Sequence, residues 1–243
     1  MNLLEVSGLA RRFGGVVAVD DCSLTVADGS ITALIGPNGS GKTTVFDLIT
    51  GFQPPDAGEV EFEGRPITGL PPDQVHRRGI GRTFQLARIF PRLTALENVL
   101  VPVRRAGLLG LLSGAATRGE TRRGHEMLEF LGLTRLAGEP AGRLSYGQRK
   151  LLELGTVMIS RPRLVLLDEP AGGVNPGILE AIATRIRDVN AAGATFLIVE
   201  HDMGFVMGLC STVLVLDRGR TIACGTPAEV RADPAVLEAY LGA

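Results

Sequence analysis

The amino-acid sequence predicts an α/β fold with a mixed sheet, an antiparallel β subdomain near the N-terminus and an inserted α-helical subdomain. Three largely apolar runs, at residues 30–35, 164–167 and 195–199, are typical of buried parallel strands, and the second is continuously apolar. Residues 58–64 alternate between apolar and polar side chains, which indicates a strand with one buried face. From about residue 87 to 142 the chain is richer in arginine, glycine and helix formers, which favours a helical insertion.

Composition limits the classes of protein to which this chain can belong. The 243 residues are enough for one large core or for a domain with a subdomain. Lysine and arginine number 25 against 26 acidic residues, a balance that argues against nucleic-acid binding. Three scattered cysteines suggest neither disulfides nor a zinc site and favour a reducing cytosol. We expect a soluble chain, because no apolar run approaches the ~20 residues that span a bilayer.

The first predicted strands are Leu3–Val6 and Cys22–Val26, which both alternate like strands with one buried face. Phe13 lies between them, followed by two glycines. Two interpretations of Phe13 stay open. It is either an ordinary core residue or an exposed ring on which a planar group such as adenine stacks.

A phosphate-binding loop follows the apolar run 30–35, and the helix-like run Val45–Ile49 comes next. Glycines let successive backbone N–H groups face a phosphate, and the following helix adds its positive N-terminal dipole. The motif predicts a P-loop nucleotide-binding core that takes ATP with Mg²⁺. Its residues are Gly36, Pro37, Asn38, Gly39, Ser40, Gly41, Lys42, Thr43 and Thr44.

Three side chains of this loop have distinct expected roles. Lys42 brings a full positive charge to the β- and γ-phosphates. Thr43 offers its hydroxyl group to Mg²⁺, and Thr44 is positioned to hydrogen-bond a phosphate oxygen.

Beyond two consecutive prolines, residues 74–78 are predicted to form a helix, and Gln85 closes a strand-like run. An amphipathic stretch from Thr94 to Val103 belongs to the predicted helical insertion. Leu108–Leu112 is either a patch that faces a partner or, as we favour, a core helix of the subdomain.

A second possible anion site begins the next predicted helix, residues 149–160, which stops before Pro162. Ser145 is a plausible N-cap for it. Together with Gly147 it makes a small helix start that is rich in N–H groups and able to meet an anion.

Carboxylates follow the second apolar run. Asp168 and Glu169 come at its end, where parallel α/β sheets bind their ligands. Asp168 is expected to hold Mg²⁺ and Glu169 to deprotonate the attacking water. His201 follows the third run and is a candidate sensor of the γ-phosphate. A hairpin at residues 213–223 and a helix from Pro234 to Leu241 complete the predicted elements.

Taken together, these segments resemble the ATP-binding subunits of ABC transporters over nearly the whole chain. Gly172–Asn175 takes the place of the D-loop in that family. Gly36–Thr44 matches the Walker A loop, and Gln85 matches the Q-loop glutamine. Leu144–Gln148 matches the signature motif. Asp168–Glu169 matches the Walker B pair, and His201 matches the switch histidine.

Within the family, five local sequences look like those of branched-chain amino acid importers. They are Phe13-Gly14-Gly15, Arg82-Thr83-Phe84-Gln85, Ala171–Pro176, Glu200–Met203 and Ala239-Tyr240-Leu241-Gly242. Two departures from the general family pattern fit this type as well. Tyr146 replaces the first glycine of the usual signature, and Asn175 replaces the usual D-loop aspartate.

The resemblance implies a role for each matched position. It implies catalytic roles for Glu169, His201 and Gln85. It implies Mg²⁺ binding by Thr43, Gln85 and Asp168, and ATP binding by Phe13, the phosphate loop, Ser145, Gly147 and Gln148. It also implies a core formed by residues 1–86 and 162–243, with residues 87–161 as the helical subdomain that carries the signature.

The partners follow from the same resemblance. Two ATPase subunits, identical or paralogous, are expected to face head to tail and to trap ATP between the Walker A loop of one and the signature helix of the other. Two transmembrane permeases and an extracytoplasmic solute-binding protein complete the expected assembly, with this chain on the cytoplasmic face of the inner membrane. Neither the solute nor the choice between homodimer and heterodimer follows from the sequence.

Three alternatives to the importer fit parts of the sequence. An ATPase of lipopolysaccharide export has similar length and element order, but the signature Leu144–Gln148 favours the importer. A non-transport ABC ATPase acting on ribosomes or DNA usually has two ATPase halves or a long coiled coil. A soluble P-loop kinase or GTPase leaves the signature motif unexplained.

Overall fold

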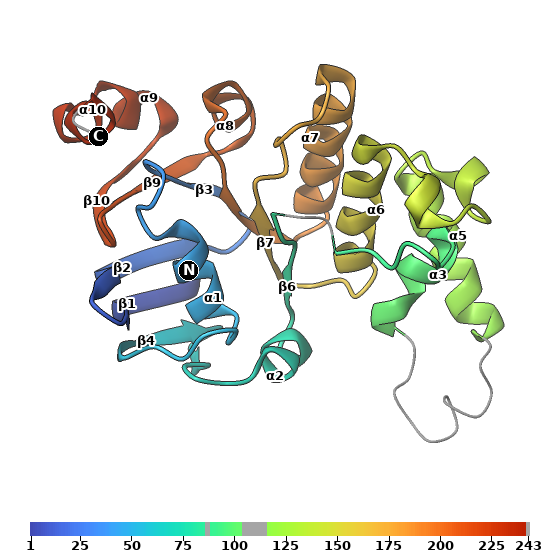
Figure 1. Ribbon diagram of the computed structural model, residues 1–243, viewed down its shortest axis with the longest axis horizontal. Helices are drawn as coiled ribbons and strands as arrows, with labels where there is room; N and C mark the ends of the chain where they lie inside the picture. Colours follow the sequence, from blue (N-terminus) through green and yellow to red (C-terminus); the bar gives the residue numbers. More distant parts are fainter. Residues whose placement is uncertain (86–87, 104–115, 242–243) are drawn as a thin grey trace. The chain divides into compact units, whose positions relative to one another are not determined.

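The structure, a computed structural model, describes residues 1–85, 88–103 and 116–241. The chain divides into two compact units. The first comprises Met1–Arg82, Arg163–Ala171 and Arg187–Ala243, and the second comprises Thr83–Pro162 and Gly172–Ile186. The predicted α/β class is confirmed, because both sheets lie in the first unit and helices dominate the second (Figure 1). Within the described residues, no helix combines the length and apolar character needed to cross a membrane.

A six-stranded sheet forms the centre of the first unit. Its order is β10 (Arg220–Gly225), β9 (Thr212–Asp217), β3 (Ile31–Ile35), β8 (Thr195–Val199), β7 (Leu164–Asp168) and β6 (Ile80–Arg82). The strands from β9 to β6 pair in parallel, and β10 returns antiparallel to β9. All residues of β3, β7 and β8 are buried, which explains why their sequences are largely apolar.

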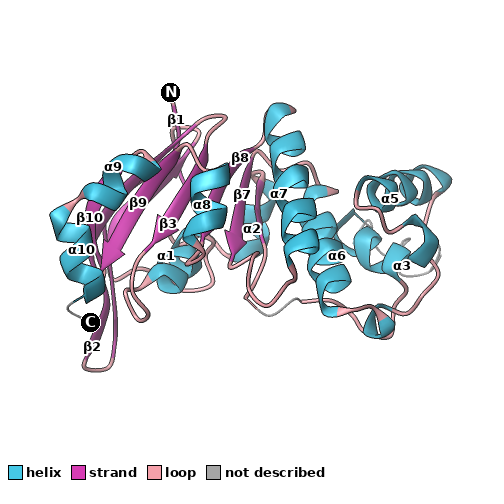
Figure 2. Ribbon diagram, turned by 90° about the horizontal axis from the view of Figure 1, so that it is seen from above, coloured by secondary structure: helices cyan, strands magenta, loops and turns pink. Residues whose placement is uncertain are grey.

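The second sheet is antiparallel and confirms the predicted β subdomain. Its order is β2 (Val16–Ala27), β1 (Asn2–Phe13), β4 (Ala57–Phe62) and β5 (Arg65–Pro66). The first two strands are much longer than the alternating stretches in the sequence, because register shifts break the alternation along β1. Figure 2 distinguishes the strands of both sheets from the helices.

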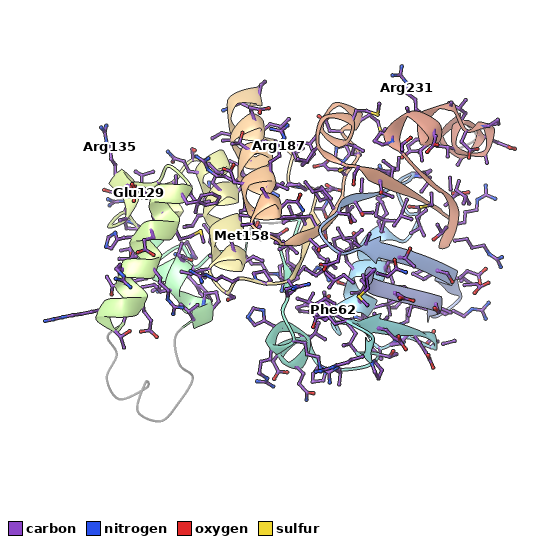
Figure 3. All side chains as sticks on the ribbon, turned by 180° about the vertical axis from the view of Figure 1, so that it is seen from behind. Phe62, Glu129, Arg135, Met158, Arg187 and Arg231 are labelled. Atoms are coloured by element: carbon purple, nitrogen blue, oxygen red, sulfur yellow. The ribbon has the colours of Figure 1, made fainter. Side chains whose placement is uncertain are left out.

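Helix α1 (Lys42–Ile49) contributes apolar side chains to the same buried cluster as both sheets. Phe46 from this helix, Phe62 from β4 and Leu166 from β7 all belong to it. Phe62, labelled in Figure 3, is among the largest fully buried side chains. The other helices of this unit are α2 (Pro72–Arg77), α8 (Met203–Leu209), α9 (Pro227–Ala232) and α10 (Pro234–Leu241).

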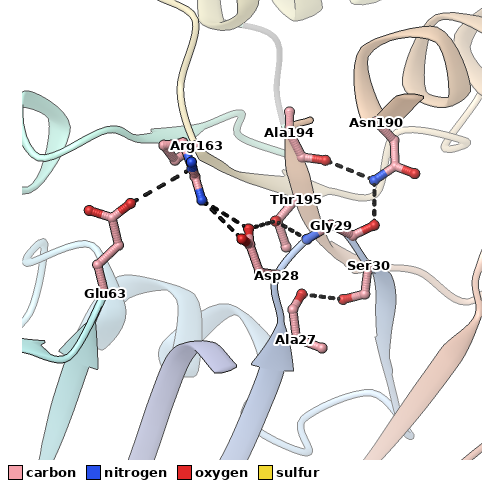
Figure 4. Close-up of polar contacts among 9 residues, drawn as sticks. All are labelled: Ala27, Asp28, Gly29, Ser30, Glu63, Arg163, Asn190, Ala194 and Thr195. Atoms are coloured by element: carbon pink, nitrogen blue, oxygen red, sulfur yellow. Dashed lines mark hydrogen bonds and ion pairs between the residues drawn. The ribbon is translucent and has the colours of Figure 1, made fainter. Parts of the chain in front are cut away.

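Polar contacts fix the starts of the central strands (Figure 4). Arg163, just before β7, donates to both carboxylate oxygens of Asp28 at 3.1 Å. The hydroxyl of Thr195 accepts from the N–H of Gly29 at 2.8 Å, and Asn190 donates to the Gly29 carbonyl at 2.9 Å. These contacts occupy the amino ends of the parallel strands, so the carboxyl ends remain for ligands.

The second unit contains α3 (Ala95–Leu100), α5 (Arg118–Phe130), α6 (Tyr146–Met158) and the first part of α7 (Pro176–Ala191). Short 3₁₀ turns lie at Val101–Val103, Thr134–Leu136 and Ala141–Arg143. Capping boxes begin three of the helices, because Thr94, Thr117 and Ser145 each accept from the N–H three residues on. The segment Leu108–Leu112 lies outside the described residues.

Candidate nucleotide-binding site

The phosphate loop connects β3 to α1, and its backbone depends on glycine at two positions. At Gly41 φ is 104°, and a Cβ atom would lie 2.3 Å from the carbonyl oxygen of Ala18. At Gly36 a Cβ atom would lie 2.0 Å from the carbonyl oxygen of Leu216. Any larger residue at either position would collide with fixed backbone, so the loop keeps its N–H groups close to where a phosphate binds.

The Lys42 side chain curves back over this loop. Its ammonium group donates to the carbonyl oxygens of Gly36 and Pro37, both at 2.9 Å. Burial lowers the pKa of Lys42, while the negative charges of Glu169 and Asp168 act to raise it. The lysine predicted to meet the phosphates therefore lies within electrostatic reach of the two predicted catalytic carboxylates.

Asp168 ends β7 and is only 2% exposed. Burial raises its pKa, and the guanidinium of Arg82 opposes that shift. One Arg82 nitrogen lies 3.5 Å from an Asp168 oxygen, and another lies 2.6 Å from Asp47 on α1. Arg82 thereby joins the phosphate-loop helix to the predicted metal-binding carboxylate, a role that the sequence analysis missed.

Glu169, the next residue, adopts a left-handed conformation with φ of 48°. Its N–H donates to the carbonyl of Val199 on the neighbouring strand at 3.0 Å. The carboxylate is partly exposed, and Nδ1 of His201 lies 4.0 Å from it. The structure therefore brings the predicted base and the predicted γ-phosphate sensor together at the carboxyl edge of the sheet.

Glu200 organises the loops around this pair, although its side chain is fully buried. Its carboxylate accepts from the backbone N–H groups of Ala171, His201 and Asp202, at 2.6, 2.9 and 3.1 Å. These bonds link the chain after β7 to the chain after β8. The burial of Glu200 could not be predicted from the sequence, because nothing in its neighbouring residues signals that a charged side chain is buried there.

Phe13 ends β1 and is 43% exposed, so it is not a core residue. The Arg11 guanidinium lies 4.9 Å from the ring centroid, and Arg11 also pairs with Asp56 at 2.8 Å. These contacts leave a partly exposed aromatic face at the tip of the β1–β2 hairpin.

The remaining predicted residues belong to the second unit. Gln85 is exposed and lies in a bend after β6. Ser145 caps α6 reciprocally with Gln148, with hydrogen bonds of 2.9 and 3.3 Å. A Cβ atom on Gly147 would lie 2.8 Å from the Ile178 side chain, so glycine lets α6 and α7 approach closely.

Tyr146 and Asn175 are the two departures from the general family pattern, and Tyr146 lies next to the segment that contains Asn175. The Tyr146 ring approaches Gly173, where an added Cβ atom would be 3.3 Å from the ring. Asn175 accepts from the N–H of Ile178 at 3.0 Å and thus caps the start of α7. Asn175 therefore has a local structural role that an aspartate could also fill.

The donor groups of the first unit fit a nucleotide with Mg²⁺. The glycine cradle offers N–H groups to phosphates, and Thr43 and Asp168 offer the oxygen ligands that Mg²⁺ prefers. Among the described residues, no group of three or more His, Cys, Asp or Glu is suited to hold a metal ion. Mg²⁺ usually takes one or two carboxylates and completes its shell with phosphates and water.

A cavity of about 480 Å³ lies on another side of the loop, bordered by residues 37–40, Asp217, Arg218 and Glu238. Burial raises the pKa of Tyr240, on α10, and an interaction with the backbone of Gly36 opposes that shift.

Comparison with known proteins agrees with this geometry. The ABC transporter family model matches residues 19–172, and a model of branched-chain amino acid ATP-binding cassette transporters matches residues 220–243. The chain is similar to the high-affinity branched-chain amino acid transport ATP-binding protein BraF of Pseudomonas aeruginosa, with 42% identity over 99% of this chain and 98% of the relative. For the corresponding protein LivG of Salmonella typhimurium the identity is 41%, with the same coverage.

A solved structure extends the comparison to three dimensions. The ADP conformation of an ATP-binding cassette of an ABC transporter has a TM-score of 0.90 and 36% identity, over 100% of both chains. A family match over more than half of the sequence, together with relatives this similar along its whole length, means that the chain belongs to the ABC transporter family.

Proposed function

We propose that this chain is the subunit of an importer that binds and hydrolyses ATP to drive uptake of branched-chain or related amino acids. The observation that carries the proposal is the convergence of Lys42, Asp168 and Glu169 at the carboxyl edge of one sheet. The amino-acid class is supported by the names of the full-length relatives and by the family match of the C-terminal segment.

In the proposed chemistry the phosphate loop binds the nucleotide phosphates through its N–H groups and Lys42. Thr43, Asp168 and Gln85 hold Mg²⁺, which offsets negative charge on the phosphates when bound. Glu169 accepts a proton from the attacking water, and His201 contacts the γ-phosphate. The role of Glu169 as the base is supported by the partial exposure of its carboxylate and by Nδ1 of His201, which lies 4.0 Å from it. Phe13 stacks on the adenine, which is supported by its exposed ring.

A second ATPase subunit, a paralogue or another copy, completes each site in this proposal. Ser145, Gly147 and Gln148 contact the nucleotide bound by the partner, and the positive end of α6 points toward its γ-phosphate. The capped, 13-residue helix α6 supports this role. Residues 87–161 act as the helical subdomain in this arrangement, and residues 1–86 and 162–243 act as the core.

The chain is proposed to lie at the cytoplasmic face of the inner membrane, bound to two permease subunits. An extracytoplasmic solute-binding protein delivers the amino acid. The names of the relatives, which are transport proteins, support this arrangement. Nucleic acid has no part in it, which the net charge of −1 supports.

An affinity isolation from detergent-solubilised membranes of the source cells tests the proposal. The Glu169→Gln variant is used with Mg²⁺ and ATP to hold the assembled state, and Lys42→Ala serves as the matched variant with impaired nucleotide binding. We expect two permeases and an ATPase partner to be recovered stoichiometrically. Recovery of ribosomal or DNA-bound material without a permease would contradict the transport function.

A further inference from the structure

Two charged side chains of α6, Lys150 and Glu153, are buried in the second unit. Their exposed fractions are 5% and 4%. Because the two residues are three positions apart on one helix, they lie on the same face, one turn from each other. Charged groups with so little contact with water require specific partners.

Several of those partners come from the short segment around Gln85. One carboxylate oxygen of Glu153 accepts from the backbone N–H groups of Phe84 and Arg88, each at 3.2 Å. The ammonium of Lys150 donates to the backbone carbonyl of Gln85 at 3.1 Å. The Arg88 guanidinium also stacks 3.7 Å from the centroid of the Phe84 ring. Each of these atoms belongs to the second unit.

These contacts of Glu153 and Lys150 are satisfied only when the segment around Gln85 has one particular placement against α6. A carboxylate can only accept and an ammonium can only donate, so the pair distinguishes N–H groups from carbonyl groups of the loop. Hydrogen bonds to charged groups contribute more than neutral ones, and a buried charge that loses its partners is strongly unfavourable. A shift of Phe84, Gln85 or Arg88 away from α6 would break these charge-assisted hydrogen bonds and is therefore unfavourable.

We propose that Glu153 and Lys150 are positioning residues that set the place of Gln85 from helix α6. The helix that begins at Ser145 and the segment that carries Gln85 then move as one body. This inference rests on the proposed function, in which Ser145 meets the partner's nucleotide and Gln85 binds Mg²⁺. Displacement of the helix start is passed to Gln85 through the two buried side chains.

Amide hydrogen exchange of the full-length chain, resolved by NMR at Phe84 and Arg88 without nucleotide, tests the contact itself. Glu153→Gln preserves the shape of the side chain but removes its charge. We expect exchange about tenfold to hundredfold faster at both amides, in line with the loss of charge-assisted hydrogen bonds. Lys150→Met, which keeps the length of the aliphatic stem, should loosen the same segment.

Glu126→Gln provides the matched control, because Glu126 is an exposed residue of α5 that pairs with Arg122 on its own helix. It should leave exchange at Phe84 and Arg88 unchanged. Circular dichroism establishes that each variant is folded. Unchanged exchange in folded Glu153→Gln and Lys150→Met would overturn the proposal, whatever the protein transports.

The positioning role is tested by ATPase measurements on the assembled transporter. Glu153→Gln should lower kcat about tenfold, while the Kd of the isolated chain for ATP with Mg²⁺ changes less than twofold. The double variant with Lys150→Met should lose less than the product of the single effects, because both residues hold one segment. Loosened amides with an unchanged kcat would overturn the positioning role. An inactive wild-type assembly would instead contradict the proposed function, and the exchange result would stand.

Discussion

At the scale of single residues, Lys42 illustrates how the site balances its charges. Its ammonium is held by two loop carbonyls, burial lowers its pKa, and two nearby carboxylates oppose that shift. Bound phosphates add negative charge next to the same ammonium. We therefore propose that Lys42 acts in nucleotide binding and that Glu169, partly exposed beside His201, acts in proton transfer.

The first prediction separates these two roles. Glu169→Gln should retain ATP binding but slow hydrolysis by about 10²–10⁴, the range for losing a general base. Lys42→Ala should lose nucleotide affinity instead, because its positive charge at the phosphates is gone. Binding is measured by calorimetry and turnover by phosphate release. A Glu169→Gln variant with wild-type turnover would remove Glu169 from the catalytic role.

Cys210 gives a prediction about pH, because burial raises its pKa to about 12. An unfolded thiol loses its proton near its ordinary pKa of 9.0, whereas the folded one keeps it. Between pH 9 and 12 the unfolded state therefore binds fewer protons, and stability falls as pH rises. The expected contribution is about 1.4 kcal/mol per pH unit in that window.

Urea unfolding under reducing conditions at pH 8, 9, 10 and 10.5 measures this dependence. Cys210→Ala should show a smaller loss of stability over the same range, although it is less stable at pH 8. Cys224 is exposed, so Cys224→Ala is the control and should follow the wild-type curve. Equal slopes for Cys210→Ala and the wild type would contradict the assignment.

At the scale of elements, the site depends on how strands end and helices begin. The loop before α1 is shaped at Gly36 and Gly41 by close approach of other backbone segments, so a larger residue at either position would collide with backbone. Helix α6 shows the same dependence on neighbours, because Gly147 lets it approach Ile178 of α7. Local propensity alone would favour alanine in such positions.

Gly41→Ala tests this dependence on neighbours. The added Cβ would lie 2.3 Å from a backbone oxygen of β2, at a φ that favours glycine. We expect a loss of stability of at least about 2 kcal/mol. Gly119→Ala is the matched control: Gly119 lies in α5 with nothing within 4 Å of an added Cβ, so it should gain up to about 1 kcal/mol. Denaturant unfolding measures both, and a destabilised control with an unaffected Gly41→Ala would contradict this account.

At the scale of the whole molecule, the proposed site is shared between two subunits. The first unit contributes the phosphate loop and carboxylates, and the second unit contributes the start of α6. In the proposed dimer these two parts act on different nucleotides. A change at the helix start should therefore leave the chain's own nucleotide site intact.

Ser145→Arg tests that division in the Glu169→Gln background, which keeps ATP bound. The large cation removes the cap of α6 and obstructs the face that meets the partner's nucleotide. Nucleotide affinity of the isolated chain should stay within about twofold, but ATP-driven dimer closure, followed by light scattering, should be lost. Arg122→Ala is the control, because the Arg122 side chain is exposed. The dimer of this variant should close normally with ATP. Closure of the Ser145→Arg variant would count against the head-to-tail arrangement.

The α/β class and the positions of the local motifs could be predicted from the amino-acid sequence alone. The phosphate loop, the carboxylates after β7 and the histidine after β8 each depend on a few neighbouring residues, so their spacing is visible in the chain. The longest described helix, α7, was not predicted from the sequence, even though Asn175 caps its start. Its start and face depend on packing as well as on pattern.

Contacts between residues that are distant in the sequence became visible only in the folded chain. Arg82 pairs with Asp47 and Asp168, Glu200 binds the N–H of Ala171, and Phe13 proves to be exposed. The reason is physical: these partners come from different elements, and burial and desolvation arise only when the sheet brings those elements together. Spacing along the chain carries no record of such contacts.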